Sequence, residues 1–80
     1  MERETIMIRV HNTADIGSLI RKKRVGLGMT QAQLADITGS GTRFVSDLEN
    51  GKQTVQTGKV LDTLQVLGLD VYISTRGETG

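Results

Sequence analysis

The order of hydrophobic and polar residues along the chain predicts a strand, four helices and a second strand. Residues 5–10 place Ile6, Ile8 and Val10 on one face of an extended segment, although Met7 on the other face weakens the alternation. Residues 69–74 alternate more regularly. Their hydrophobic face is expected to hold Leu69, Val71 and Ile73.

The first helix is expected to begin at Asn12 or Thr13, either of which can cap it, and to run to about Leu27. Helical spacing predicts a core-facing stripe of Ile16, Leu19, Ile20 and Leu27. Arg24 interrupts this stripe. Because one charge of a buried pair left alone costs several kcal/mol, we expect an anionic partner, and Glu49 is the candidate. The alternative is that Arg24 extends to solvent along its aliphatic stem.

A second helix is expected after Gly28, and it opens with a capping box formed by Thr30 and Gln33. Leu34 and Ala35 should face inward, and the small Ala35 allows the next helix to approach closely. A sharp turn at Gly39, which can adopt a positive φ, follows this helix.

The third helix is expected from about Thr42 to Glu49, with Val45 and Leu48 as its buried pair and Gly51 at its end. The side chains expected to project away from the core are Thr42, Arg43, Phe44, Ser46 and Asp47. Two short helices joined by a tight turn, the second with exposed hydrogen-bonding groups, form the layout of a helix-turn-helix. Such a second helix fits the major groove of DNA.

A fourth helix is expected from about Gln56 to Leu67, followed by Gly68 as its cap. Its hydrophobic face is predicted to hold Val60, Leu61, Leu64 and Leu67. The whole chain of 80 residues is therefore expected to be one domain. Its parts are an N-terminal arm or strand over 1–12, a helical core over 13–68, a dimerisation strand over 69–74 and a flexible tail over 75–80.

The exposed side of the third helix carries the candidate chemistry. Arg43 can donate two hydrogen bonds to guanine, a contact that discriminates by about 1–3 kcal/mol, and Thr42 and Ser46 can bond bases or phosphates. Phe44 could contact a thymine methyl group or pack into the core. Asp47 could accept from cytosine, keep the helix soluble or, as the favoured interpretation, orient Arg43 four residues earlier.

Phosphate contacts are expected on either side of that helix. Gln31 lies in the first turn of the second helix, where free N–H groups and the helix dipole favour an anion. Lys52 follows the third helix and is a second candidate. Net charge is only +1, but the residues from Arg21 to Arg24 form a dense basic cluster. The alternative is that this cluster is simply a solvated helix face.

Composition excludes several other classes of protein. The chain has no cysteine and only one histidine, His11, which excludes disulfides and gives no basis for a metal site or other cofactor. No nucleophile with a nearby base and no glycine-rich phosphate loop is present, so we do not expect an enzyme. Neither a membrane span of roughly 20 residues nor a signal peptide is apparent, which favours a cytoplasmic protein.

With these residues in place, the chain resembles the xenobiotic-response-element and Cro/C1-type helix-turn-helix family over roughly residues 15–68. The segment Arg-Lys-Lys-Arg-Val-Gly-Leu-Gly-Met-Thr-Gln-Ala-Gln-Leu-Ala and the segment Gly-Thr-Arg-Phe-Val-Ser-Asp-Leu-Glu-Asn-Gly-Lys carry the resemblance. The second segment, with Leu-Gly-Leu-Asp-Val after the last helix, is most similar to HipB-type antitoxins.

The resemblance implies a mainly α, lambda-repressor-like domain of four to five helices with a short terminal strand. It implies a homodimer that binds a palindromic operator in double-stranded DNA, represses its own operon and restrains a HipA-like kinase toxin. The implied base-contacting positions fall on Thr42, Arg43 and Asp47, and backbone contacts on Gln31, Ser46 and Lys52. The family's structural ion pair falls on Arg24 and Glu49. Gly41, in place of the usual Ser or Thr cap, and the acidic Asp47 depart from the family pattern.

Three questions stay open at the level of sequence. The strand over 69–74 could pair with its twin across a dimer, as in HipB-like proteins, with residues 5–10 of its own chain, or with both in one small sheet. A free-standing phage-type or housekeeping repressor would have the same DNA-binding helix and no toxin. A protein-interaction module would use the fold without binding DNA.

Overall fold

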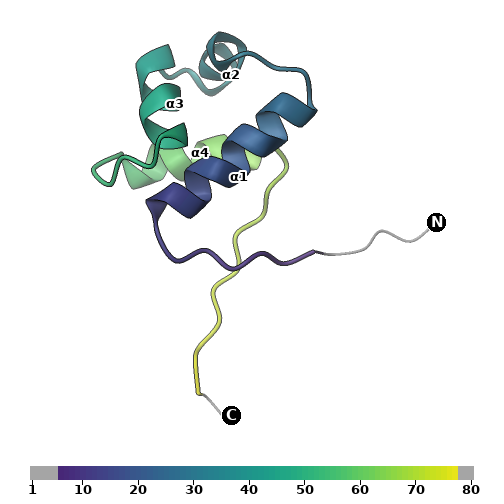
Figure 1. The fold of residues 1–80 in the computed structure, drawn as a ribbon, viewed down its shortest axis with the longest axis vertical. Helices are drawn as coiled ribbons and strands as arrows, with labels where there is room; N and C mark the ends of the chain where they lie inside the picture. The colour runs from purple at the N-terminus through teal and green to yellow at the C-terminus, as the bar shows by residue number, and fades with distance from the viewer. Residues whose placement is uncertain (1–5, 78–80) are drawn as a thin grey trace, which may run out of the picture.

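The computed structural model describes residues 6–77, and its four helices are arranged around a small core (Figure 1). They are α1 (Thr13–Gly26), α2 (Gln31–Thr38), α3 (Thr42–Glu49) and α4 (Thr57–Val66). Helix α3 packs against both α1 and α2, and α2 also packs against α4. Within the described part of the chain, no helix has the length and apolar character needed to cross a membrane.

Helices α1 and α2 begin where the capping side chains predict. Asn12, rather than Thr13, caps α1, and its Oδ1 accepts a hydrogen bond from the Asp15 backbone N–H at 2.9 Å. The capping box of α2 is confirmed: the Thr30 hydroxyl accepts from the Gln33 N–H at 3.0 Å, and the Gln33 side chain accepts from the Thr30 N–H at 2.8 Å. Because these caps satisfy free N–H groups, they fix the start of each helix.

The core confirms most of the predicted buried positions. Its buried members are Ile20, Leu34, Ala35, Val45, Leu48, Val60, Leu64 and Leu67. Two predictions were wrong, because Leu27 and Leu61 are exposed. Helix α1 ends at Gly26, so Leu27 lies in the following turn, outside the helical register of the stripe. Leu61 lies about 100° around α4 from the buried Val60, beyond the arc that the core covers.

One core position, Thr63 on α4, carries a hydroxyl and was not predicted from the sequence. Thr63 on α4 is fully buried, and its Oγ1 donates to the Lys59 carbonyl at 2.7 Å. This hydrogen bond within the helix satisfies the hydroxyl, so burial leaves no unpaired polar group. Thr63 can therefore take a place on the inner face of α4 that the pattern of aliphatic residues did not predict.

Gly17 lets α1 cross the end of α3 at very close range. It is buried in the middle of α1, and a β-carbon placed there would overlap the Leu48 carbonyl oxygen and lie 3.0 Å from that of Glu49. Gly51 also lies close to the backbone of α1, because a β-carbon there would lie 2.9 Å from the α-carbon of Ala14. The C-terminal end of α3 is thus pressed against α1 backbone to backbone.

The ion pair that the sequence predicted between Arg24 and Glu49 is present and buried, and the structure shows that three helices meet at it. Arg24 of α1 donates from Nε to Glu49 Oε2 at 2.6 Å and from Nη2 to Oε1 at 2.9 Å. Its Nη1 donates to the Met29 carbonyl at 2.7 Å, and Gln31 of α2 donates to Glu49 Oε1 at 3.1 Å. The side chains of Arg24 and Glu49 are only 11% and 3% exposed, so the alternative of a solvent-extended Arg24 is excluded.

The same contacts set the protonation of Glu49. Burial by itself raises the pKa of this carboxyl, but hydrogen bonds from Arg24 and Gln31, with the charges of Arg24 and Arg21, outweigh burial and lower the pKa below its ordinary value. The Glu49 hydrogen bonds raise the pKa of Arg24. The pair is therefore charged on both sides at neutral pH, and its donors and acceptors are matched.

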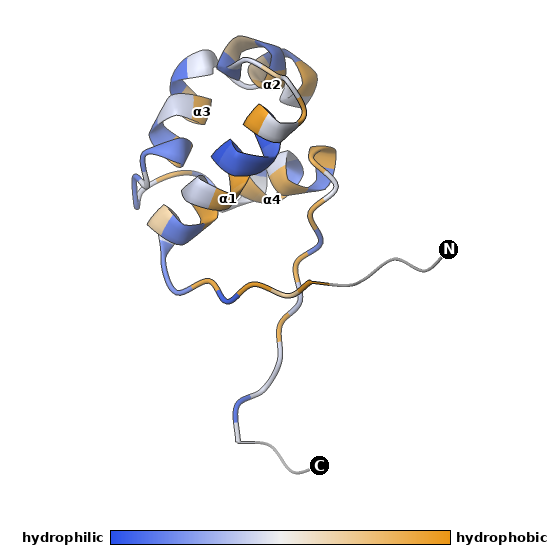
Figure 2. Cartoon of the chain, turned by 45° about the vertical axis from the view of Figure 1, so that its right-hand side comes forward, coloured by the Kyte–Doolittle hydropathy of each residue, from blue (hydrophilic) through white to orange (hydrophobic). Residues whose placement is uncertain are grey.

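The two predicted strands do not form within the single chain. No residue from 6 to 77 belongs to a strand, although the segments 6–10 and 69–74 are extended. They run away from the helices as two arms, and the colour of the ribbon marks hydrophobic residues along both of them (Figure 2). Position 5 of the predicted first strand lies outside the described residues. Strand pairing needs a neighbouring backbone, and among residues 6–77 neither segment has one alongside it.

Replacing Gly17 with alanine should destabilise the domain by about 1–3 kcal/mol, because the added methyl group forces α1 and α3 apart. Gly26→Ala in the same helix is the matched control. A β-carbon at Gly26 meets nothing within 4 Å, so alanine should be neutral or stabilising there. Urea unfolding followed by circular dichroism measures both variants. Equal effects from the two substitutions would contradict the close approach.

The Glu49→Gln variant should lower the free energy of unfolding at pH 7 by about 3 kcal/mol, because Arg24 keeps a buried charge without its partner. A lowered pKa in the folded state means that the stabilisation is complete above the ordinary glutamate pKa of about 4.3 and is lost as pH falls through the lower folded value. The stabilities of wild type and variant should therefore converge at acid pH. Urea unfolding between pH 7 and pH 2 tests this.

The exposed carboxylate of Asp36 provides the control for that titration. It makes no ion pair among the described residues, so Asp36→Asn should leave the acid dependence of wild type unchanged. A constant difference between wild type and Glu49→Gln across the whole pH range would contradict the account of the ion pair.

Candidate nucleic-acid interface

Helix α3 has one side in the core and one side in solvent. Val45 and Leu48 are fully buried, whereas Thr42 and Arg43 at the start of the helix are exposed. The helix is capped by the backbone of Gly41 with no side-chain hydrogen bond, which leaves its first N–H groups open to a ligand. The start of α3 therefore offers a polar, outward-facing surface on a rigid support.

The Arg43 side chain lies at the exposed start of α3. Within residues 6–77 it takes part in no ion pair and no side-chain hydrogen bond. All five of its N–H donors are therefore available, in the planar arrangement that matches the two acceptors of guanine.

Phe44 packs inward, which is one of the two arrangements that the sequence left open. Its side chain is half-buried against the hydrophobic core, and the Lys59 Nζ lies 5.8 Å from the ring centroid. A cation at this distance from an aromatic face stabilises the contact and holds the ring in place. Sequence gave no signal for Lys59, because only the fold brings α4 beside the start of α3. A base contact by the exposed part of the ring stays a prediction.

Asp47 does not orient Arg43, so the favoured interpretation of its role was wrong. Its Oδ2 lies 3.5 Å from the Lys52 Nζ instead. The turn after α3 explains the exchange of partners: Gly51 has a φ of 81°, and the Lys52 N–H donates to the Asp47 carbonyl at 3.0 Å. This hydrogen bond folds the chain back along α3 and brings Lys52 beside Asp47.

The other predicted contact residues lie near α3 but are less open. Ser46 is half-buried on α3, and Gln31 is half-buried at the first turn of α2. The Gln31 amide already donates to Glu49, so its side chain supports the ion pair. Lys52 is exposed over about half of its side chain. The structure thus places the predicted residues on or beside one helix.

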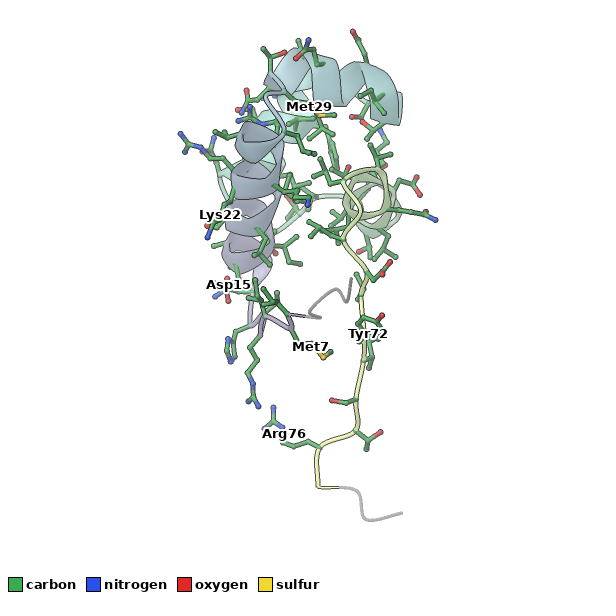
Figure 3. All side chains as sticks on the ribbon, turned by 90° about the vertical axis from the view of Figure 1, so that its right-hand side faces the viewer. Met7, Asp15, Lys22, Met29, Tyr72 and Arg76 are labelled. Atoms are coloured by element: carbon green, nitrogen blue, oxygen red, sulfur yellow. The ribbon has the colours of Figure 1, made fainter. Side chains whose placement is uncertain are left out.

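The basic cluster of α1 divides into two parts. Arg24 is turned inward to Glu49, whereas Arg21, Lys22 and Lys23 are exposed. Lys22 projects from the outer side of α1, away from the other helices (Figure 3). Arg21 lies close enough to Glu49 for its charge to lower the pKa of that carboxyl. Three cations therefore remain on the surface of α1.

Comparisons with known proteins agree with this arrangement. Residues 20–72 match a family model described as helix-turn-helix. The chain is 47% identical over 70 residues to the uncharacterized HTH-type transcriptional regulator y4mF of Sinorhizobium fredii (strain NBRC 101917 / NGR234). That alignment covers 88% of this chain and 92% of the relative.

Solved structures of HipB have the same fold. The chain is similar to HipB in a HipA–HipB–O2–O3 complex, with a TM-score of 0.78 and 20% identity over 88% of this chain and 99% of that one. HipB in a complex with an O4 20mer gives the same values. The resemblance found in the sequence is confirmed at the level of fold and family: the chain belongs to the helix-turn-helix family of DNA-binding transcriptional regulators.

Proposed function

We propose that the chain is a homodimeric, operator-binding repressor of its own operon and the antitoxin of a HipA-like kinase toxin, acting in the cytoplasm. The observation that carries the DNA-binding part is the position of Arg43. It lies exposed at the start of α3 without an ionic partner in the described chain, while Val45 and Leu48 anchor the opposite side of the helix.

Sequence discrimination is assigned to the start of α3. Arg43 contacts guanine, Thr42 bonds a neighbouring base, and Asp47 accepts from cytosine once Lys52 turns to the DNA backbone. The exposed part of Phe44 contacts a thymine methyl group from its packed position. Every one of these groups is held by a helix whose inner face is fully buried, so their spacing is fixed before DNA binds.

Affinity is assigned to contacts with phosphates. Lys52 supplies a cation, Ser46 a hydroxyl, and Gln31 its second amide hydrogen and the N–H groups at the start of α2. Phosphate contacts of this kind release counterions and make binding strongly dependent on salt. They position α3 in the groove without discriminating between sequences.

Two copies of the chain are needed to bind a palindrome. In a homodimer with twofold symmetry, the two α3 helices would enter successive major grooves about 34 Å apart. The C-terminal segment 69–74 is the proposed dimerisation element. Leu69 packs half-buried on the helical core, and Val71 and Ile73 beyond it are exposed. The segment is extended, so it can pair as a strand with the same segment of a second copy.

The antitoxin part rests on similarity to HipB, which one of the related structures contains together with HipA. Its test is whether a HipA-like kinase encoded beside this chain's gene co-elutes with the chain in size-exclusion chromatography. Co-elution is expected. Absence of the kinase, or separate elution, would contradict the antitoxin role and favour a free-standing repressor, with DNA binding unaffected.

Arg43→Ala should abolish most of the preference for the operator over a scrambled duplex, by about 1–3 kcal/mol for each guanine contact. Lys52→Ala is the comparison variant. It should weaken both duplexes about equally and reduce the salt dependence, because a phosphate contact carries no sequence information. Gel-shift titrations at fixed and varied salt measure both effects. Full operator selectivity in Arg43→Ala would overturn the assignment of α3.

A further inference from the structure

We propose that the N-terminal arm, residues 6–10, is a second dimerisation element that pairs as a β-strand with the C-terminal segment, residues 69–74, of a second copy of this chain. The inference extends the homodimer of the proposed function and rests on it. In the resulting layer, each C-terminal segment pairs with its twin along one edge and with the partner's arm along the other.

The arm is far more hydrophobic than a solvated peptide. Apart from Arg9, the residues from 6 to 10 are all apolar, and their exposed fractions range from 77% at Ile6 to 40% at Val10. Both faces of the extended backbone therefore present hydrophobic side chains to water. A cluster of this kind on a small protein marks an interaction surface.

The C-terminal segment has the matching properties. Val71, Tyr72 and Ile73 are exposed, with Ile73 at 95% the most exposed large hydrophobic residue of the described chain. Backbone–backbone hydrogen bonds outside the helices end at Leu69, and among residues 6–77 none is made by residues 70–77 or by residues 6–10. Both segments therefore leave a row of N–H and C=O groups open, which is the template for strand addition.

The arrangement of the two segments points to another molecule as the partner. Within one chain, the arm crosses the C-terminal segment instead of running along it (Figures 1 and 2). The view turned by 90° shows Met7 on the arm and Tyr72 on the C-terminal segment, with the two backbones apart (Figure 3). The crossing brings both segments to one side of the molecule but forms no ladder between them. A second copy of the chain has the same two segments. Its strands can lie alongside both edges of the C-terminal segment.

Charge favours pairing between an arm and a C-terminal segment. Arg9 is the single charged residue of segment 6–10, and Asp70 is the single charged residue of segment 69–74. Opposite charges on neighbouring strands stabilise a sheet and like charges destabilise it. An arm beside a C-terminal segment therefore places charges of opposite sign on neighbouring strands.

Sedimentation equilibrium of single variants tests the arm. Ile8→Asp should weaken the dimer at least about tenfold, because a carboxylate would be buried in the sheet. Val25→Asp is the matched control: Val25 has the same exposed fraction, 59%, but lies on α1 outside both segments, so its dimer should stay within about twofold of wild type. Circular dichroism of each variant checks that the helices remain folded.

The dimerisation of Ile73→Asp, in the C-terminal segment, is measured in the same way. Comparison with Ile8→Asp distinguishes failure of the arm's role from failure of the proposed repressor dimer. Dimerisation lost in Ile73→Asp but unchanged in Ile8→Asp would overturn the role of the arm and leave the repressor dimer intact. A wild-type chain that is monomeric at all concentrations would overturn the dimer itself.

Charge exchange tests which segments meet. Arg9→Asp and Asp70→Arg chains, when mixed, restore opposite charges at both arm contacts of the heterodimer, whereas each homodimer has like charges. Native mass spectrometry should find heterodimers about fivefold above the statistical proportion. Wild type mixed with Asp70→Arg is the control. Its heterodimer has the same Asp–Arg pair at position 70 of the two C-terminal segments, but it does not restore opposite charges at both arm contacts. An excess no larger than in this control would overturn pairing between arm and C-terminal segment.

Discussion

The buried contact between Arg24 and Glu49 is the interaction on which the rest of the domain depends. It joins α1 to the end of α3, and Gln31 adds the start of α2 to the same carboxylate. A helix-turn-helix works only if its two short helices keep one fixed angle, and eight-residue helices have little core of their own to fix it. Because removal of either charge leaves the other buried, the network admits one arrangement of the three helices.

Close packing completes what the ion pair begins. Gly17 allows the backbone of α1 to touch the end of α3, so the hydrophobic side of α3 is fully covered and its polar side must face outward. The small helical core does not cover every hydrophobic residue of the chain. A chain of 80 residues that holds its core in four short helices still carries exposed apolar residues on both terminal segments. The proposed dimer would cover these residues.

Sequence predicted the features that follow from local rules. The four helices, their caps and most of the core follow from periodicity and capping, and the partner of Arg24 could be predicted because a charge within a hydrophobic stripe requires compensation. Features that depend on how helices meet were not predictable. Gly17 looks like an unfavourable helix residue until α3 is placed against it, and Asp47 takes Lys52 as its partner only because the turn after α3 folds back. Strands need a neighbouring backbone, which a single sequence does not specify.

The central claim is that two copies of α3, held outward by this network, enter adjacent major grooves of one operator. A hydroxyl-radical footprint on the DNA upstream of the chain's own gene tests it most directly. Two protected patches are expected on the same face of the duplex, with centres about 10 base pairs apart and symmetric in sequence. A single patch, or protection that does not depend on sequence, would contradict it.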